Sequence, residues 1–261
     1  MADNTGGSAC TADGQRKPLI CVTPRWLEIP RFPMMPDQIA PHEAAANVQM
    51  DAIIAAGGLP LMMPLTTDRG LMREYVAMCD GFSMPGGQDV NPRLWGSDEE
   101  VVPSLLCAER DAFDYPFLEE VLAAHKPLFT ICRGTQMLNV VCGGTLCMEV
   151  TRRTPRAGMA NWRHTGILNG VAHEVEVRED TLLSRCVGGA RTIQVNSSHH
   201  CCVERLGTGL ELVGEATDGM PEAVEMPGEP FVLGVQWHPE YTWSYVQTDR
   251  MLWDAFIAAC R

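Results

Sequence analysis

The sequence lacks the marks of a secreted or membrane protein. Its first residues, "MADNTGGSACTADGQRKP", contain no apolar core of the kind that a signal peptide needs. No uninterrupted apolar run approaches the ~20 residues of a membrane-spanning helix. The 11 cysteines are irregularly spaced and form no CxxC pair, which favours reduced thiols over a disulfide framework. We therefore expect a cytoplasmic protein without a membrane partner.

Positive charge is scarce as well. The chain has 20 Lys and Arg against 33 Asp and Glu, which gives a net charge of −13. A field of this sign repels phosphate, so a nucleic-acid partner is not expected. Internal repeats and low-complexity linkers are also missing, and 46% of the 261 residues are hydrophobic, enough for a substantial core. We expect a flexible tail over residues 1–17 and one domain over residues 18–261.

The first half of the chain alternates short apolar runs with helical patterns. The runs, interpreted as buried strands, are residues 18–26, 59–64, 80–87 and 128–131. The helical patterns are residues 42–58, 68–79, 108–125 (apart from Pro116) and 134–142. This alternation predicts an α/β fold whose mostly parallel central sheet has helices on both faces.

The second half has a different texture. Its short β-rich segments are residues 171–177, 190–195, 210–217, 222–226 and 231–237, and a helix is predicted over residues 249–260. Several of these segments are expected to pair as antiparallel strands at one edge of the sheet. The fold class is therefore α/β with a smaller antiparallel β region in the C-terminal half.

One cysteine, Cys132, has the setting of a nucleophile. It follows the apolar run 128–131 directly, and a helical segment opens with Gly134 two residues later. Ligands of parallel sheets bind beyond the carboxyl ends of the strands, and a sharp strand-to-helix turn exposes a side chain. A helix N-terminus also favours the reactive thiolate. The alternative is a buried cysteine that only fills core space.

Two further segments could supply partners for this thiol. In "GVQWHPE", His238 and Glu240 would lie on the same side of an extended chain. A carboxylate in that position can hold an imidazole in one tautomer, although a surface histidine beside an acid would look the same. In "MPGGQDVNP", Gly86 and Gly87 could present backbone N–H groups of the kind that form an oxyanion hole, or could simply make a turn.

The stretch "HHCC", His199 to Cys202, invites a metal-site interpretation. Consecutive side chains of an extended segment point to opposite faces, so four in a row do not readily converge on one ion. No metal site is assigned to this stretch.

Taken together, six segments resemble a known family. They are "PGGQDVNPRLWG", "ERD", "ICRGTQMLNVVCGGTL", "VNSSHH", "DGMPEAVE" and "GVQWHPE", in this order. The chain resembles class I glutamine amidotransferase-like proteins, and more closely their γ-glutamyl-γ-aminobutyrate hydrolase branch, peptidase family C26. The resemblance implies a single flavodoxin-like class I glutamine amidotransferase domain.

The resemblance also implies roles for individual residues. The catalytic triad would be Cys132, His238 and Glu240. The oxyanion hole would consist of backbone N–H groups of Gly87, Gly86 and Arg133. Gln136 would contact the substrate amide. The α-amino and α-carboxylate groups of the substrate would be held by Asn196, Ser197 and His199.

The sequence departs from the family pattern at three positions. Thr130 stands two residues before the nucleophile, where the family usually has glycine, and its branched side chain is expected to crowd the turn. Cys201 replaces a common glutamine, which would alter the pocket around the glutamyl group. Cys21 stands where the first strand often carries glycine. None of these changes removes a member of the implied triad.

The expected function is hydrolysis of a γ-glutamyl amide through a γ-glutamyl thioester, releasing glutamate and an amine. The substrate is expected to be a small molecule such as γ-glutamyl-γ-aminobutyrate, with no metal or organic cofactor; a homo-oligomer is left open. One alternative is the glutaminase subunit of an amidotransferase that delivers ammonia to a synthetase partner. A second alternative is a non-catalytic ligand-binding member of the fold.

A basic segment, residues 151–163, suggests a preference for the leaving amine. It carries Arg152, Arg153, Arg156 and Arg163 and no acidic residue. At the rim of the site, guanidinium groups would favour an amine that bears a carboxylate, such as γ-aminobutyrate, over a polyamine. The alternative is a solvated loop without substrate contact.

Overall fold

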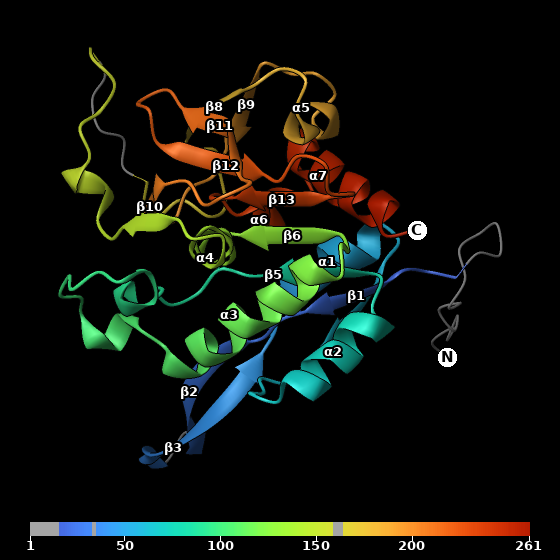
Figure 1. Cartoon of the computed structure of the whole chain (residues 1–261), viewed down its shortest axis with the longest axis vertical. Coiled ribbons are helices and arrows are strands. Elements are labelled where there is room, and N and C mark those ends of the chain that lie inside the picture. Colours follow the sequence, from blue (N-terminus) through green and yellow to red (C-terminus); the bar gives the residue numbers. More distant parts are fainter. Residues whose placement is uncertain (1–15, 33–34, 159–163) are drawn as a thin grey trace.

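The computed structural model describes residues 16–32, 35–158 and 164–261. The tail expected over residues 1–17 therefore lies almost entirely outside the described residues. A nine-stranded sheet forms the centre of the molecule (Figure 1). Across the sheet its strands are β4 (Leu59–Met62), β1 (Leu19–Val22), β5 (Gly81–Met84), β6 (Leu128–Ile131), β13 (Val232–Val235), β12 (Pro221–Glu225), β11 (Glu211–Ala216), β8 (His173–Val177) and β9 (Thr192–Val195).

The sheet has a parallel half and an antiparallel half. The strands from β4 to β13 pair in parallel, and those from β13 through β12 to β9 pair antiparallel. The predicted fold class is therefore confirmed. The segment that contains β13 was grouped with the β-rich edge, but β13 lies between β6 and β12 and belongs to both halves. Its end therefore lies next to the end of β6.

Helices cover both faces of the sheet, each over its own hydrophobic core. One face carries α1 (Asn47–Ala55), α5 (Leu182–Cys186), α6 (Pro239–Thr242) and α7 (Gln247–Ala259). The other carries α2 (Arg69–Met78), α3 (Ala108–Ala123) and α4 (Arg133–Val141). Strand β6 serves both cores, because Leu128 packs on the α3 side and Phe129 on the α7 side, as the alternation of side chains along a strand requires.

Helix α3 continues through Pro116, where a break was expected. Proline removes one helical hydrogen bond and usually kinks a helix. Here the buried rings of Phe113 and Phe117 stack with their centroids 5.0 Å apart, on either side of Pro116 in the sequence. Packing of this apolar face against the sheet outweighs the local preference of proline.

The main element that the sequence did not predict is a hairpin formed by β2 (Arg25–Phe32) and β3 (Met35–Ala44). It projects from the parallel half of the molecule (Figure 1). The expected helix over residues 42–58 begins only at Asn47. Prolines are depleted in strands. Because Pro30 and Pro41 interrupt these segments, the sequence did not indicate that they form strands.

The smaller elements connect this framework. They are the antiparallel pair β7 (Thr145–Cys147) and β10 (Cys202–Arg205), and the 3-10 helices η1 (Pro92–Trp95), η2 (Pro103–Leu105) and η3 (Val150–Arg152). Within the described ranges, no helix is both long enough and apolar enough to cross a membrane.

Candidate active site

Cys132 stands in a strained turn at the end of β6. Its φ of 50° and ψ of −108° lie outside the regions that side-chain-bearing residues favour, and α4 begins at the next residue. Its backbone N–H donates to the carbonyl of Val235 over 2.7 Å, which ties the turn to the end of β13. The sharp strand-to-helix turn predicted from the sequence is confirmed. Backbone strain of this kind is typical of functional sites.

His238 and Glu240 meet as expected, but for a different structural reason. His238 Nδ1 lies 2.8 Å from Glu240 Oε1. The chain is not extended here, because α6 starts at Pro239, so the alternation argued from the sequence does not apply. A tight turn into the helix brings the two side chains together instead. Arg25 approaches the same carboxylate, with Nη2 3.7 Å from Glu240 Oε1, a neighbour that the sequence did not indicate.

The environment of His238 favours its protonated form. Burial opposes the charge, but the Glu240 carboxylate and the Cys132 sulfur hold the pKa of His238 well above its usual value. Gly86 lies against both groups: a Cβ on Gly86 would be 2.8 Å from His238 Cε1 and 3.3 Å from Cys132 Cβ. The loop after β5 can pass this close only because residue 86 has no side chain.

The expected oxyanion donors lie around the same turn. Arg133 is the first residue of α4, and the first N–H groups of a helix have no partner within it. Gly87 lines the cavity beside Cys132. The oxyanion hole implied by the resemblance stays a prediction for these two backbone groups.

A buried ionic cluster lies behind these donors. The Arg133 guanidinium donates to Asp111 over 2.7 Å and also to Asp114. Arg110 Nε donates to Asp114 over 3.0 Å. A Cβ on Gly87 would be 3.0 Å from Arg110 Nη1, so the cluster supports both the Gly87 loop and the start of α4. The segment "ERD" (residues 109–111), noted in the sequence, contains Arg110 and Asp111 but not the other two members of this cluster, Asp114 and Arg133.

The cavity at Cys132 has a volume of about 170 Å³. It is lined by Gly87, Gln88, Asp89, Ser104, Leu105, Cys132, Gln136, Ser198, His199, His200 and Cys201. Gln136 and His199, both implied as substrate contacts, are among these residues. The Gln136 amide donates to the carbonyl of Cys201 over 3.1 Å and lies 3.2 Å from Gln236 Oε1.

Asn196 and Ser197 lie behind this wall and bind backbone groups. The Asn196 side chain accepts from the His238 N–H over 2.8 Å and donates to the His238 carbonyl over 2.7 Å. Ser197 Oγ donates to the carbonyl of His164 over 2.9 Å. Asn196 thus positions the histidine, and Ser198, which was not predicted, lines the cavity in place of Ser197.

The departures at Thr130 and Cys201 are accommodated. Thr130 Oγ1 lies 3.0 Å from Thr135 Oγ1 and faces Gly234 on β13, so the expected crowding of the turn is wrong. Cys201 lines the cavity and its Sγ donates to the Met148 carbonyl over 3.1 Å. Burial and the nearby Asp89 carboxylate raise the pKa of the Cys201 thiol, so it stays protonated at neutral pH.

The described arginines of the basic segment are bound to carboxylates. Arg152 pairs with Glu99, Arg153 with Glu204 over 3.0 Å, and Arg156 with both Glu176 and Glu215. Arg163 lies outside the described residues. None of these three residues is among those that line the cavities of about 170, 410 and 590 Å³, so the described part of the segment gives no support to a leaving amine that bears a carboxylate.

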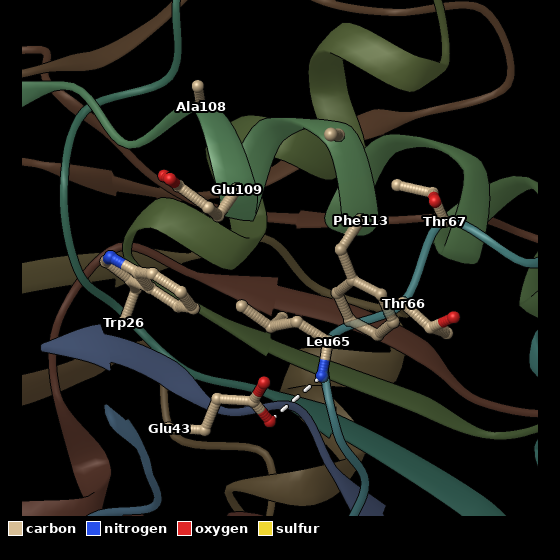
Figure 2. A pocket seen from close by; sticks show the side chains of 9 residues that line it. Trp26, Glu43, Leu65, Thr66, Thr67, Ala108, Glu109 and Phe113 are labelled. Carbon is tan, nitrogen blue, oxygen red and sulfur yellow. Dashed lines mark hydrogen bonds between the residues drawn. The ribbon is translucent and has the colours of Figure 1, made fainter. Parts of the chain in front are cut away.

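Two larger cavities extend away from Cys132. One, of about 410 Å³, shares Gln88 and Ser104 with the cavity at the thiol. It shares Trp26, Ala108 and Glu109 with the other, of about 590 Å³. Figure 2 shows this last cavity between the hairpin, which carries Trp26 and Glu43, and α3, which carries Glu109 and Phe113. The three cavities are therefore neighbours that lie between the thiol and the hairpin.

The comparisons with solved structures agree with this architecture. A putative GMP synthase subunit from Thermoplasma acidophilum aligns with a TM-score of 0.60 at 15% identity, over 94% of this chain and 96% of its own. The glutaminase domain of Trypanosoma brucei CTPS with bound acivicin aligns with a TM-score of 0.61 at 14% identity, over 94% of both chains. At these identities the likeness concerns the fold.

The comparisons with protein sequences show the family. Protein NtpR of Enterococcus hirae is 35% identical over 211 residues, which cover 80% of this chain and 86% of that protein. The γ-glutamyl-γ-aminobutyrate hydrolase PuuD of Escherichia coli K12 is 32% identical over 216 residues, which cover 81% and 84%. The model of the Peptidase C26 family matches residues 18–240. The chain therefore belongs to the peptidase C26 family, within the class I glutamine amidotransferase-like hydrolases.

Proposed function

We propose that this protein is a cysteine-dependent hydrolase of γ-glutamyl amides. The observation that carries the proposal is the pairing of His238 with Glu240 beside Cys132, a thiol that lines a cavity of about 170 Å³. An imidazolium next to a thiol at a helix N-terminus stabilises the thiolate, which is the nucleophilic form. The name of the E. coli relative supports a γ-glutamyl substrate.

The chemistry follows from these groups. The Cys132 thiolate attacks the side-chain carbonyl carbon, and the C–S bond forms while N–H groups of Gly87 and Arg133 stabilise the oxyanion. His238 gives its proton to the departing amine as the C–N bond breaks, which leaves a γ-glutamyl thioester. Water then attacks the thioester and gives a proton to His238. The C–S bond breaks, and glutamate and the thiolate are released.

The two larger cavities suggest what the leaving amine carries. The described residues that line the two larger cavities include the carboxylates Glu28, Glu43 and Glu109 and no Lys or Arg. The Trp26 ring adds a surface that attracts cations. We therefore propose an amine with a second, positively charged nitrogen, rather than one that bears a carboxylate. A site of this size also exceeds what release of ammonia from glutamine requires.

The test compares three substrates with the purified full chain: γ-glutamyl-putrescine, γ-glutamyl-γ-aminobutyrate and glutamine. Glutamate release is measured, with the Cys132→Ala variant as the background. We expect the highest kcat/KM for γ-glutamyl-putrescine. A preference for γ-glutamyl-γ-aminobutyrate would reject the cationic leaving group but keep the hydrolase. Turnover of glutamine alone would support the amidotransferase subunit, and no turnover of any amide would reject the catalytic proposal.

A further inference from the structure

A cluster of buried histidines surrounds one glutamate on the far side of the cavity wall. Glu222 lies on β12 and His173 on β8, whereas His164 and His199 come from the segments before β8 and after β9. All four residues are at most 5% exposed. The proposed hydrolysis uses neither His164, His173 nor Glu222, so the cluster needs its own explanation.

Three imidazole nitrogens approach the same carboxylate oxygen. The distances to Glu222 Oε1 are 3.2 Å from His164 Nδ1, 3.4 Å from His173 Nε2 and 3.5 Å from His199 Nε2. None of the three contacts has the geometry of a hydrogen bond: these nitrogens and both Glu222 oxygens are buried without a hydrogen-bond partner. Buried polar atoms are nearly always paired, so such a group of atoms calls for a ligand.

The outer nitrogen of each histidine already faces an acceptor. The contacts are His164 Nε2 to Asp218 Oδ2 at 3.0 Å, His173 Nδ1 to the Glu174 carbonyl at 3.3 Å, and His199 Nδ1 to the Cys201 carbonyl at 3.0 Å. A carboxylate or carbonyl oxygen only accepts, so the proton of a neutral ring sits on the outer nitrogen. Each inner nitrogen faces a carboxylate oxygen, so a cation lies between the two atoms, either a ring proton or a metal ion.

Metal-binding histidines have this same arrangement. They donate the outer N–H to a carboxylate or carbonyl, which fixes the ring and aims the other nitrogen at the metal. The Glu222 carboxylate is buried among these rings and supplies an oxygen of the kind that binds zinc.

We propose that His164, His199 and Glu222 bind one divalent transition-metal ion, with Zn²⁺ preferred. Their ligand atoms lie within 4.8 Å of one another. Ligands at 2.0–2.2 Å from a tetrahedral zinc ion lie about 3.3–3.6 Å apart, close to the 3.2 Å and 3.5 Å found here. Imidazole and carboxylate ligands suit zinc. His173 Nε2 lies 3.4 Å from the same oxygen but does not belong to this set.

The ion has a structural role in this arrangement. The backbone N–H of His199 donates to the backbone carbonyl of His164 over 2.7 Å. His199 also lines the cavity at Cys132. An ion held by both histidines and by β12 would fix this wall of the cavity to the sheet. It takes no part in the chemistry at the thiol, so its removal is expected to lower stability and raise KM more than it lowers kcat.

The test measures bound metal in the full chain carrying Cys132→Ala, which removes the thiol at the active site as a zinc ligand. The protein is stripped with a chelator, dialysed against Zn²⁺ and analysed for metal content. We expect about one tightly held ion per chain, lost in Glu222→Gln and retained more weakly in His173→Gln. Matched controls are His125→Asn, an exposed histidine beside Glu229, and His200→Asn; both should keep the ion.

X-ray absorption on the zinc-loaded protein decides the case even if Glu222→Gln fails to fold. The proposed site gives a shell of nitrogen and oxygen only. A second group, Asp89, His200 and Cys201, also has ligand atoms within 4.8 Å of one another and would add sulfur. Sulfur in the shell, loss of the ion in His200→Asn, or no tightly held zinc would each overturn the proposal.

Discussion

Thr130 on β6 faces Gly234 on β13, and its hydroxyl occupies the space that a side chain at position 234 would need. The two residues are paired in register, and a Cβ on Gly234 would lie 2.7 Å from Thr130 Oγ1. The missing glycine before the nucleophile is thus matched by a glycine on the neighbouring strand. The turn at Cys132 keeps its shape because Gly234, on the neighbouring strand, leaves room for the Thr130 side chain.

Gly234→Ala should therefore disturb the active site. The added methyl group would also meet Thr135 Cγ2 at 2.7 Å, so we expect a loss of about 1–3 kcal/mol in unfolding free energy and a lower kcat. Adding Thr130→Gly should restore part of both. Gly170→Ala is the control, because its Cβ would find only Ile167 Cγ2 at 3.8 Å. The unfolding free energy is measured in urea, together with kcat. A Gly234→Ala variant with the stability and kcat of the wild type would contradict the packing described.

Cys132→Ala should abolish hydrolysis without loss of the fold. Removal of a covalent nucleophile is expected to lower kcat by at least about 10³-fold, while circular dichroism and the melting temperature change little. A matched Cys201→Ser variant should keep most of its turnover, since the pKa of that thiol is raised by burial and Asp89. Iodoacetamide should label Cys132 before Cys201. Turnover by Cys132→Ala above a tenth of the wild-type rate would contradict the mechanism.

Glu240→Gln should shift the pH profile. The Glu240 carboxylate is one cause of the raised pKa of His238, and the proposed reaction needs the protonated ring. Activity is therefore lost as pH rises through that pKa, and the alkaline limb of kcat/KM should move to lower pH in the variant. We expect kcat to fall by about 10²–10⁴-fold. Glu229→Gln, which removes a carboxylate beside the exposed His125, should change neither the limb nor kcat. An unmoved alkaline limb in Glu240→Gln would exclude the role of Glu240.

Glu43→Gln with Glu109→Gln should weaken selection of a cationic amine. Both carboxylates line the cavity near the hairpin, and removal of two charges should lower kcat/KM for γ-glutamyl-putrescine about tenfold relative to glutamine. Glu74→Gln, on the exposed face of α2, is the control. Equal effects on both substrates would show that the cavity does not bind the leaving amine.

Asp249→Asn should flatten the dependence of stability on pH. Burial raises the pKa of Asp249 from its ordinary value of 3.8 to about 6. The folded state therefore holds a proton that the unfolded state has lost, and stability falls as pH rises from about 4 to about 6. The asparagine can still accept a hydrogen bond from Trp237 and donate one to Thr242. Urea unfolding measured between about pH 4 and pH 6 should therefore show a smaller loss of unfolding free energy in the variant than in the wild type. Asp254→Asn, at an exposed ion pair on the same helix, should leave it unchanged.

The sequence by itself determined the parallel half of the sheet and the positions of Cys132, His238 and Glu240. Periodicity of apolar residues specifies which faces are buried, and the strand-to-helix turn is encoded locally in "ICRGTQ". These signals act over a few residues and can be seen without any knowledge of the neighbours. The contact between His238 and Glu240, two residues apart, was expected from the sequence, although the turn into α6 and not an extended chain brings them together.

Only the tertiary structure decided which distant residues meet. Gly234 makes room for Thr130 from 104 residues further along the chain. His164 contacts Asp218, 54 residues away in the sequence. The arginines of residues 151–158 form ion pairs with carboxylates on other segments. Such pairings follow from burial and packing in three dimensions, because burying a charge is favourable only where a partner is already in place. Local patterns do not carry that information.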